Sequence, residues 1–331
     1  MKILISELVK KLNGKIKNVE NESLQLVSCA SLESAKENEI TFFNTESFAR
    51  QDIKKLTEKL KKTMAGIVLT NKEIKDVKKP FLIVENPKKS FQKIIKLLHK
   101  AGKKTGISKT ASIDSSVEFE DKSSVFIGDF VVLKNNVKIG KNVEIDSLVS
   151  IKNNSTIGEN TRIDSHVSIE SAKIGKDCSI CAGVRIGSQG FGYASSQNGH
   201  DFIEHIGRVE IGNEVNVGAN SCIDRGMLNN TIIGDGTKID NLVMIGHGCV
   251  VGKNCLMAGQ AGLAGGTILE DFVICGGQSA IGGHLTIEAG TQVAGQAGVI
   301  SNLKKGIYMG FPAEDRMQFL RKQVALKKLI K

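Results

Sequence analysis

Apolar residues recur at every sixth position through most of the chain after residue 126. The first unbroken series is Ile127, Leu133, Ile139, Ile145, Ile151, Ile157, Ile163 and Ile169. The register slips by one at Ile174, is interrupted, returns at Ile211, breaks again, and then continues from Ile233 to Val299. A glycine, small or acidic residue usually follows each apolar position. A period of six fits neither an α-helix nor the 3.5-residue seam of a coiled coil.

This period is typical of the hexapeptide form of the parallel β-helix, in which three six-residue units close one triangular coil. We expect each inward residue to stack on its equivalent 18 residues later, about 4.8 Å further along the axis. Glycine and asparagine at the corners permit a positive φ. The chain has 35 glycines, and before residue 111 they occur only at Gly14, Gly66, Gly102 and Gly106. The sequence therefore predicts a mainly β protein with a solenoid over residues 106–311.

The two ends of the chain lack this period. Residues 1–105 read as a small α/β domain, with helices expected at 6–12 and 48–62 and strands at 66–70 and 81–84. Asn86 and Pro87 suit the N-cap and first turn of a helix running to about residue 99. Residues 312–331 form a C-terminal helical extension. Its apolar positions predict a helix that covers the open end of the solenoid or packs against another copy of the chain.

Composition narrows the class of protein. No stretch reaches the roughly 18 apolar residues of a membrane helix, and the N-terminus lacks a secretory signal, so we expect a cytoplasmic protein with seven reduced cysteines. The lone CxxC at Cys178 and Cys181 is expected to pack in the fold, with no metal site. A net charge of +10 suggests nucleic acid, yet residues 111–311 carry 15 basic and 21 acidic residues. No nucleic-acid partner is therefore expected.

Two breaks in the repeat are the expected places for function, because a solenoid accommodates insertions where they leave the coil surface. The first, residues 188–208, contains Phe191, Tyr193, His200 and His205, and the second spans residues 224–231. We expect the first to be a lid or a subunit contact. Phe191 and Tyr193 are predicted to contact substrate.

Two histidines occur within the second unbroken series of hexads. His247 and His284 belong to hexads that begin 36 residues apart, which is two full coils, so both should lie on one corner of the prism. On the coil between them the matching positions are Gly265 and Gly266. We expect a slot without side chains, flanked by imidazoles, in which backbone N–H groups could stabilise an oxyanion. Histidine tolerated at a polar corner is the alternative explanation.

Asp240 and Asn241 precede His247 by seven and six residues, which places them at the preceding corner of the prism. A carboxylate beside the imidazole would raise its basicity and select its tautomer. The alternative is an ordinary hexapeptide turn, as at Asp146 and Asp164. A zinc site is not expected, because histidines two coils apart cannot both reach one ion at about 2.1 Å.

Several motifs together resemble one enzyme family. They are "ITFFN" at 40–44, "GFGYA" at 190–194, "IGRVEIG" at 206–212, "IDRG" at 223–226, "TIIGDGTKIDNLVMIGHG" at 231–248 and "IGGH" at 281–284. In combination they resemble UDP-3-O-(3-hydroxyacyl)glucosamine N-acyltransferase, the third enzyme of bacterial lipid A synthesis. The likeness runs essentially end to end.

The resemblance implies a homotrimer of left-handed β-helices with active sites between subunits. It implies transfer of a 3-hydroxyacyl group from the phosphopantetheine of acyl carrier protein to the 2-amine of UDP-3-O-acylglucosamine, with no bound cofactor. His247 matches the general base and His284 an assisting histidine, Asp240 and Asn241 match orienting residues, and Gly265 matches the backbone oxyanion donor.

Further site residues follow from the same resemblance. The uridine pocket of the first domain maps to Phe42, Asn44 and Phe48. We expect Gly295 and Gly298 to leave a long acyl groove. A set of basic residues after residue 311 suits an acidic carrier protein; it includes Arg316, Arg321 and Lys322.

Other interpretations stay open at this point. A sugar O-acyltransferase or a coenzyme A-dependent N-acetyltransferase would share the hexapeptide pattern, and a non-catalytic solenoid would need no base. A gamma-type carbonic anhydrase is disfavoured by the histidine spacing. Peripheral contact with the inner membrane is also left open.

Overall fold

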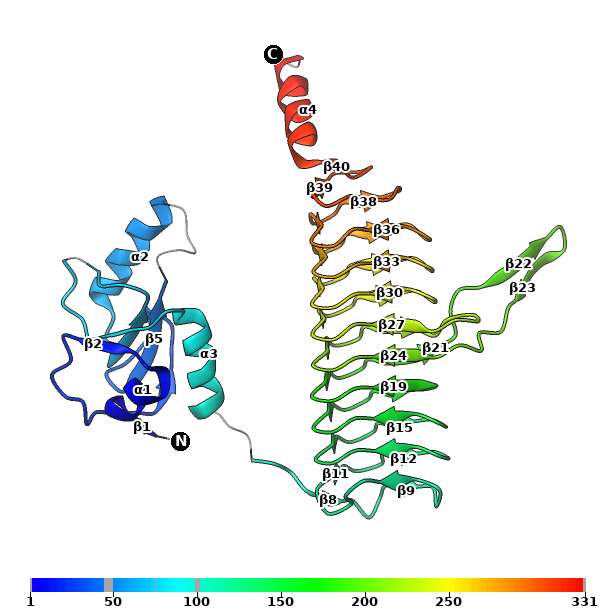
Figure 1. Cartoon of the computed structure of the whole chain (residues 1–331), viewed down its shortest axis with the longest axis horizontal. Helices are drawn as coiled ribbons and strands as arrows, with labels where there is room; N and C mark the ends of the chain where they lie inside the picture. Colours follow the sequence, from blue (N-terminus) through cyan, green and yellow to red (C-terminus); the bar gives the residue numbers. More distant parts are fainter. Residues whose placement is uncertain (1, 45–49, 75, 99–101, 330–331) are drawn as a thin grey trace. The chain divides into compact units, whose positions relative to one another are not determined.

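The structure is a computed structural model that describes residues 2–44, 50–74, 76–98 and 102–329. The chain divides into two compact units, Met1–Lys103 and Lys104–Lys331. The first is an α/β domain and the second is a long parallel solenoid (Figure 1).

The first unit is built on a five-stranded sheet. Its order is β2 (Lys15–Lys17), β7 (Phe81–Ile83), β6 (Ile67–Thr70), β5 (Glu39–Phe43) and β4 (Ser28–Cys29). Only the β2–β7 pair is antiparallel in this sheet. A separate antiparallel pair joins β1 (Ile3–Leu4) to β3 (Gln25–Leu26).

Three helices complete the described part of this unit. They are α1 (Ile5–Leu12), α2 (Arg50–Lys62) and α3 (Pro87–Leu98). The predicted helix and strand positions are confirmed to within two residues where the structure describes them. The Asn86 side chain accepts a hydrogen bond from the Lys89 N–H at 2.9 Å, so the predicted N-cap is present. Residues 45–49, including Phe48, lie outside the described residues.

The second unit stacks short strands into three parallel sheets, one for each face of a triangular prism. The first face comprises β10 (Glu118–Phe119), β13 (Lys138–Ile139), β16 (Thr156–Ile157), β19 (Ala172–Ile174), β24 (Val209–Ile211), β27 (Thr231–Ile233), β30 (Val250–Val251), β33 (Ile268–Leu269) and β36 (Thr286–Ile287). The second comprises β8 (Gly106–Ile107), β11 (Phe126–Ile127), β14 (Glu144–Ile145), β17 (Arg162–Ile163), β20 (Ser179–Ile180), β25 (Asn216–Val217), β28 (Lys238–Ile239), β31 (Leu256–Met257), β34 (Ile274–Cys275), β37 (Gln292–Val293) and β39 (Ile307–Met309), closed by the antiparallel β40 (Glu314–Asp315).

The third face carries the site described below. It comprises β9 (Ser112–Ile113), β12 (Val132–Leu133), β15 (Ser150–Ile151), β18 (Ser168–Ile169), β21 (Arg185–Ser188), β26 (Cys222–Asp224), β29 (Met244–Ile245), β32 (Gly262–Leu263), β35 (Ala280–Ile281) and β38 (Gly298–Val299).

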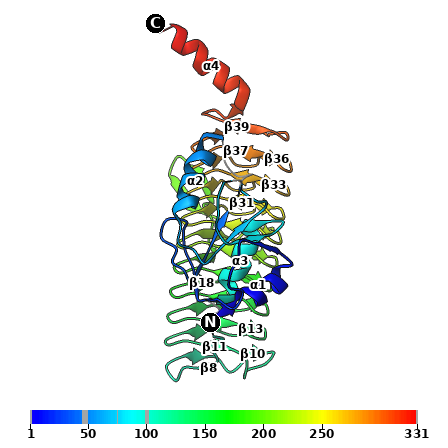
Figure 2. The same ribbon diagram turned by 90° about the vertical axis from the view of Figure 1, so that its left-hand side faces the viewer.

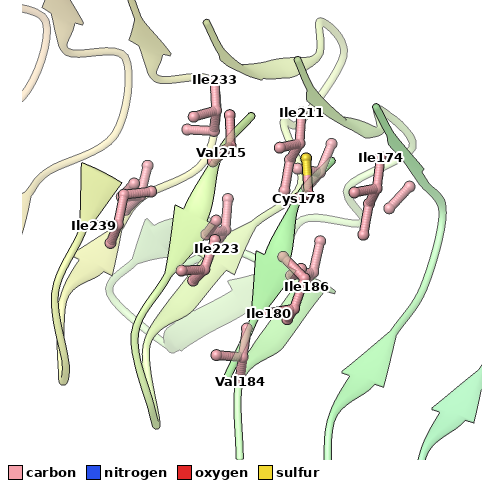
Figure 3. Packing of buried hydrophobic residues seen from close by; sticks show 14 of the residues in the cluster. Ile174, Cys178, Ile180, Val184, Ile186, Ile211, Val215, Ile223, Ile233 and Ile239 are labelled. Atoms are coloured by element: carbon pink, nitrogen blue, oxygen red, sulfur yellow. The ribbon is translucent and has the colours of Figure 1, made fainter. Parts of the chain in front are cut away.

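The six-residue period places one apolar side chain of each strand inside the prism. Ile127 pairs with Ile145, and Ile145 with Ile163, each 18 residues apart. Ile163 pairs with Ile180 across 17 residues, which is the slip visible in the sequence. Figure 3 shows a section of the same core, in which buried side chains such as Ile180, Ile186 and Ile223 extend into the interior from successive coils. The stack continues across both insertions, because Ile186 pairs with Ile223 and Ile223 with Ile245.

Corner residues adopt the left-handed conformation, as expected, but glycine and asparagine do not fill all of these positions. Leu148, Leu242, Phe130 and Phe272 also have φ between 58° and 62°. The hydrogen bonds between coils hold the corner in place: the N–H of Leu148 donates to the Asp129 carbonyl and that of Phe272 to the Lys253 carbonyl, both at 2.9 Å. Pairing with neighbouring coils therefore overrides the local preference for glycine.

The C-terminal helix α4 (Arg316–Leu329) does not cover the open end of its own solenoid. None of its residues is buried, and Met317 and Val324 are each 54% exposed. The helix continues past the last coil in both views (Figure 1, Figure 2). The predicted capping role is therefore wrong for a single chain, and β40 ends the stack instead.

None of the helices in the described part of the chain has both the length and the apolar character needed to cross a bilayer.

Candidate active site

Two histidines and two glycines meet at one corner of the prism. Strands β29, β32 and β35 are neighbours in one sheet, so the turns that follow them lie one above another. A Cβ added to Gly265 would lie 2.5 Å from the His247 Nε2 atom, and one added to Gly266 would collide with the His284 ring. The two imidazoles thus lie against glycine backbone. They line a pocket of about 330 Å³.

The environment of His247 favours the neutral ring. Burial lowers the pKa of His247, and the charges of His205 and His284 lower it further. A neutral imidazole retains a lone pair and can accept a proton. The base form of His247 should therefore persist to a lower pH than that of an ordinary histidine.

A backbone donor lies beside this base. Within the described residues the Gly265 N–H donates no hydrogen bond, whereas the N–H groups on either side are engaged. Ala264 donates to the Ile281 carbonyl at 3.0 Å and Gly266 to the His247 carbonyl at 2.9 Å. Gly265 therefore has an N–H available for a developing oxyanion next to the His247 ring.

The first insertion supplies a residue whose place in the site cannot be read from the six-residue period. Residues 193–202 form the hairpin β22 (Tyr193–Ser196) and β23 (Gly199–Phe202), which projects from the coils (Figure 1). The chain then returns so that His205 lies against His247, with the ring centroids 5.0 Å apart. In the sequence, the only sign of a role for His205 is that it lies in a break of the hexapeptide repeat. Its contact with His247 depends on how the insertion folds back onto the coils.

The second insertion lines the same pocket. Met227, Leu228 and Asn229 contribute to it together with His247 and His284. Asp224, at the start of this insertion, is only 7% exposed, and burial raises its pKa to about 6. These residues were not singled out from the sequence, because a break in a repeat shows where a loop leaves the coil but not which side chains return to it.

Asp240 and Asn241 lie on a different corner from His247. Asp240 accepts a hydrogen bond from the Gly259 N–H at 3.1 Å, and Asn241 accepts one from the Ala219 N–H at 2.7 Å. Both line a pocket of about 490 Å³ that does not include His247. A single chain therefore does not place the carboxylate beside the imidazole. The reason is geometric, since one strand and one turn separate consecutive corners.

The predicted aromatic contacts of the hairpin form a chain of rings. Phe191 and Tyr193 lie 5.1 Å apart, Tyr193 and Phe202 5.5 Å, and Phe202 and His205 6.0 Å. Phe191 is 86% exposed, and neither it nor Tyr193 lines the pocket around His247 in the described chain. Their predicted contact with substrate stays a prediction.

The uridine residues predicted for the first unit lie at a pocket of about 450 Å³. Phe42 and Asn44 line it, together with Phe91, whose ring centroid is 4.8 Å from that of Phe42. Lys59 is also part of the lining. This pocket offers aromatic faces and a cation within one cavity.

The predicted acyl groove is filled at one of its two glycines. A Cβ on Gly298 would collide with the Phe311 ring, so the space left by this glycine holds an aromatic side chain. An open groove at Gly298 is therefore wrong for a single chain, because the segment after β39 returns across β38. A Cβ added to Gly295 would meet only the backbone of Gly277, with the carbonyl oxygen 3.2 Å away.

The three basic residues predicted to bind carrier protein lie on α4 and are exposed. Lys322 forms an ion pair with Glu314, while Arg316 and Arg321 form no ion pair with any described residue.

For metal ions, the described residues contain no group of three or more histidine, cysteine, aspartate or glutamate side chains that could hold one.

The fold and the repeats define the class. The solenoid is a left-handed parallel β-helix of hexapeptide repeats, and residues 154–188 and 230–265 match the family model of bacterial transferase hexapeptides. The crystal structure of Arabidopsis UDP-N-acetylglucosamine acyltransferase has the same fold, with a TM-score of 0.57 and 20% identity over 66% of this chain and 76% of that chain. The structure of LpxA from Acinetobacter baumannii also has this fold, with a TM-score of 0.50 and 23% identity over 66% of this chain and 77% of that chain.

The first unit makes the assignment more specific. Residues 23–97 match the family model of UDP-3-O-(3-hydroxymyristoyl) glucosamine N-acyltransferase, LpxD. The UDP-3-O-acylglucosamine N-acyltransferase of Methylobacterium nodulans is 43% identical over 159 residues, covering 48% of this chain and 45% of that protein. The Wolinella succinogenes protein of the same name is 45% identical over 161 residues, which cover 48% of this chain and 51% of that protein. The chain spans about half the length of the curated relatives it matches. The resemblance inferred from the motifs is thus confirmed over the matched residues, where a segment that matches the LpxD family model is followed by hexapeptide repeats. A likeness that extends over the whole chain stays a prediction.

Proposed function

We propose that this protein transfers a 3-hydroxyacyl group from acyl carrier protein to the 2-amine of UDP-3-O-(3-hydroxyacyl)glucosamine. The observation that carries the proposal is the His247 corner, where a base with a lowered pKa lies against Gly265 and its unengaged N–H. The matched relatives, which are UDP-3-O-acylglucosamine N-acyltransferases, support the substrate class. The reaction yields UDP-2,3-diacylglucosamine and would take place in the cytoplasm.

In the proposed reaction the amine nitrogen attacks the thioester carbonyl carbon. His247 Nε2 takes a proton from the nitrogen as the new C–N bond forms, and the carbonyl oxygen gains negative charge that the Gly265 N–H stabilises. The C–S bond then breaks, and the imidazolium returns the proton to the departing pantetheine sulfur. His284, at the same pocket, would assist at the thioester. The pantetheine belongs to the donor, so the protein itself needs no bound cofactor.

Two further features of the proposal concern assembly and substrate binding. Since Asp240 and Asn241 lie on another corner, a homotrimer would bring them from a neighbouring chain to the His247 pocket. The pocket at Phe42 and Asn44 would hold the uridine, whose flat ring suits aromatic faces and whose diphosphate suits a lysine such as Lys59.

The test is an assay with purified full-length protein, UDP-3-O-acylglucosamine and a set of hydroxyacyl carrier proteins, with products identified by mass. His247→Ala should lower turnover by about 10²- to 10⁴-fold, the usual contribution of a general base. His166→Asn is the matched control, because His166 is a corner residue with φ of 61° that asparagine tolerates.

Three results would contradict the proposal. No amide product from any donor would refute the activity, and acylation of a hydroxyl or use of acetyl-coenzyme A alone would indicate a different hexapeptide acyltransferase. Full activity of His247→Ala would refute the role of the base.

A further inference from the structure

His205 is enclosed between two aromatic neighbours. Its side chain is 2% exposed, and its ring lies 6.0 Å from Phe202 in a stacked arrangement and 5.0 Å from His247 at an interplanar angle of 79°. The last residues of the hairpin insertion therefore form one wall of the His247 environment.

Hydrogen bonds determine how the His205 ring is oriented. The ring Nδ1 lies 2.8 Å from the Ile203 carbonyl, and because a carbonyl only accepts, Nδ1 must carry the proton. The His205 backbone N–H donates to Gln189 Oε1 at 2.9 Å, and the Gln189 amide nitrogen donates to Glu204 at 2.9 Å. The ring is thus held from the backbone of its own segment and from the start of the insertion.

The other ring nitrogen of His205 is buried and, among the described residues, has no hydrogen-bond partner. A Cβ on Gly190 would lie 2.8 Å from this Nε2 and 2.6 Å from the His247 Cβ, so the nitrogen borders the same gap as the base. Gly192 leaves equally little space, since its Cβ would lie 2.6 Å from the His205 Cε1. An apolar side chain would fill this gap without an unsatisfied nitrogen, so packing alone does not account for a histidine here.

We propose that His205 is a positioning residue for His247: the hairpin insertion holds the His205 ring perpendicular to the base, which keeps the His247 Nε2 facing Gly265. This rests on the proposed function, in which His247 acts as the base. His205 does not line the pocket around His247 and is not expected to touch substrate.

The contact is also electrostatic. The titratable groups that act on His247 are His205, from the hairpin side, and His284, from a following coil. Glu204, next to His205 in the chain, accepts a hydrogen bond from Gln189. Replacing the His205 imidazole, which lowers the pKa of His247, should therefore let His247 bind a proton at higher pH, which a purely structural role would not produce.

The experiment compares His205→Gln, His205→Leu and His205→Ala in the full chain. Glutamine can still donate to the Ile203 carbonyl, so its turnover should stay within about threefold of wild type, whereas alanine should lower kcat about 10-fold with little change in KM. In all three, the acidic limb of the kcat/KM profile should move to higher pH. His200→Gln is the matched control: the same substitution at an exposed histidine of β23 should change neither quantity.

A second readout is independent of activity. The six histidines can be labelled and their ring protons titrated by NMR, with His247 assigned from the His247→Ala spectrum. The His247 titration should move to higher pH in His205→Gln. If neither the His247 titration nor kcat changes in the His205 variants, while the protein is active, the inference is overturned. If the His247 titration moves but every variant keeps the wild-type kcat, the positioning role is overturned. Wild-type protein that acylates no acceptor refutes the proposed function, while the NMR titration still decides whether His205 acts on His247.

Discussion

Single residues shape the His247 corner because each has a neighbour one coil away. Gly265 and Gly266 are needed for close approach, since a methyl group at either would meet an imidazole of the adjoining coil. His284 itself has φ of 58°, so its backbone occupies the left-handed corner that glycine fills in other coils. The positions of the imidazole rings at this corner therefore depend on how the backbone of successive coils stacks, as well as on the histidines themselves.

Asp224 provides a prediction about stability. Burial raises its pKa to about 6 from an ordinary value near 3.8, so the folded state binds a proton that the unfolded state has already lost between these values. Wild-type stability should fall as pH rises through this window and stay lower above it. Asp224→Asn removes the effect and should stabilise the protein by on the order of 2 kcal/mol at pH 7.5, with almost no effect near pH 3.5.

The measurement is denaturant unfolding of both proteins at several pH values. Asp201→Asn, an exposed aspartate on β23, is the control and should show no such dependence. Equal stabilisation by Asp224→Asn at both pH values would mean that titration of this carboxyl is not the cause.

Among the helices, α4 alone has no buried side chain within the described residues. Its exposed basic side chains lie beyond the last coil, where an acidic partner can approach without disturbing the core. Arg321 is the better probe than Lys322, because the Lys322 ammonium is already paired with Glu314.

Arg321→Glu should raise KM for the acyl carrier protein donor by about fivefold or more, because reversing a charge at an electrostatically complementary contact weakens association. The kcat value and the melting temperature should change little. The measurement is steady-state kinetics with carrier-protein donor and with a short acyl-pantetheine that lacks the protein. Lys109→Glu, an exposed lysine of the first coil, is the charge-matched control, and an equal effect of both variants or on both donors would count against a docking role.

At the scale of the whole molecule, the proposed site is divided between corners. His247 and His284 share one corner of a chain, whereas Asp240 belongs to another. If a trimer completes the site, the base and the carboxylate come from different chains.

Mixed trimers test this arrangement. His247→Ala and Asp240→Ala chains should each be poorly active alone. When the two chains are coexpressed and only trimers that contain both are kept, about one third of the sites should be active, because one of the three interfaces in each mixed trimer joins an intact His247 to an intact Asp240. Activity is measured on trimers purified through two different tags.

The matched control mixes His247→Ala with His284→Ala chains. Both residues lie at one corner of the same chain, so no mixed site contains both, and activity should not return. Recovery in this control, or its absence in the first mixture, would contradict the division of the site between subunits.

The periodic part of the molecule was open to prediction from the sequence. A six-residue period determines which side chain points inward, which coil lies above another, and hence that His247, Gly265 and His284 share an edge. These relations repeat with every coil and depend only on counting residues. The capping of α3 by Asn86 is equally local.

Only the tertiary structure decided the relations that the insertions and the chain end create. The contact of His205 with His247, the return of Met227 to the same pocket, and the Phe311 ring over Gly298 join segments with no common period. The physical reason is that a repeat transmits its geometry from coil to coil, whereas a loop that leaves the coil is placed by the contacts it finds on its return.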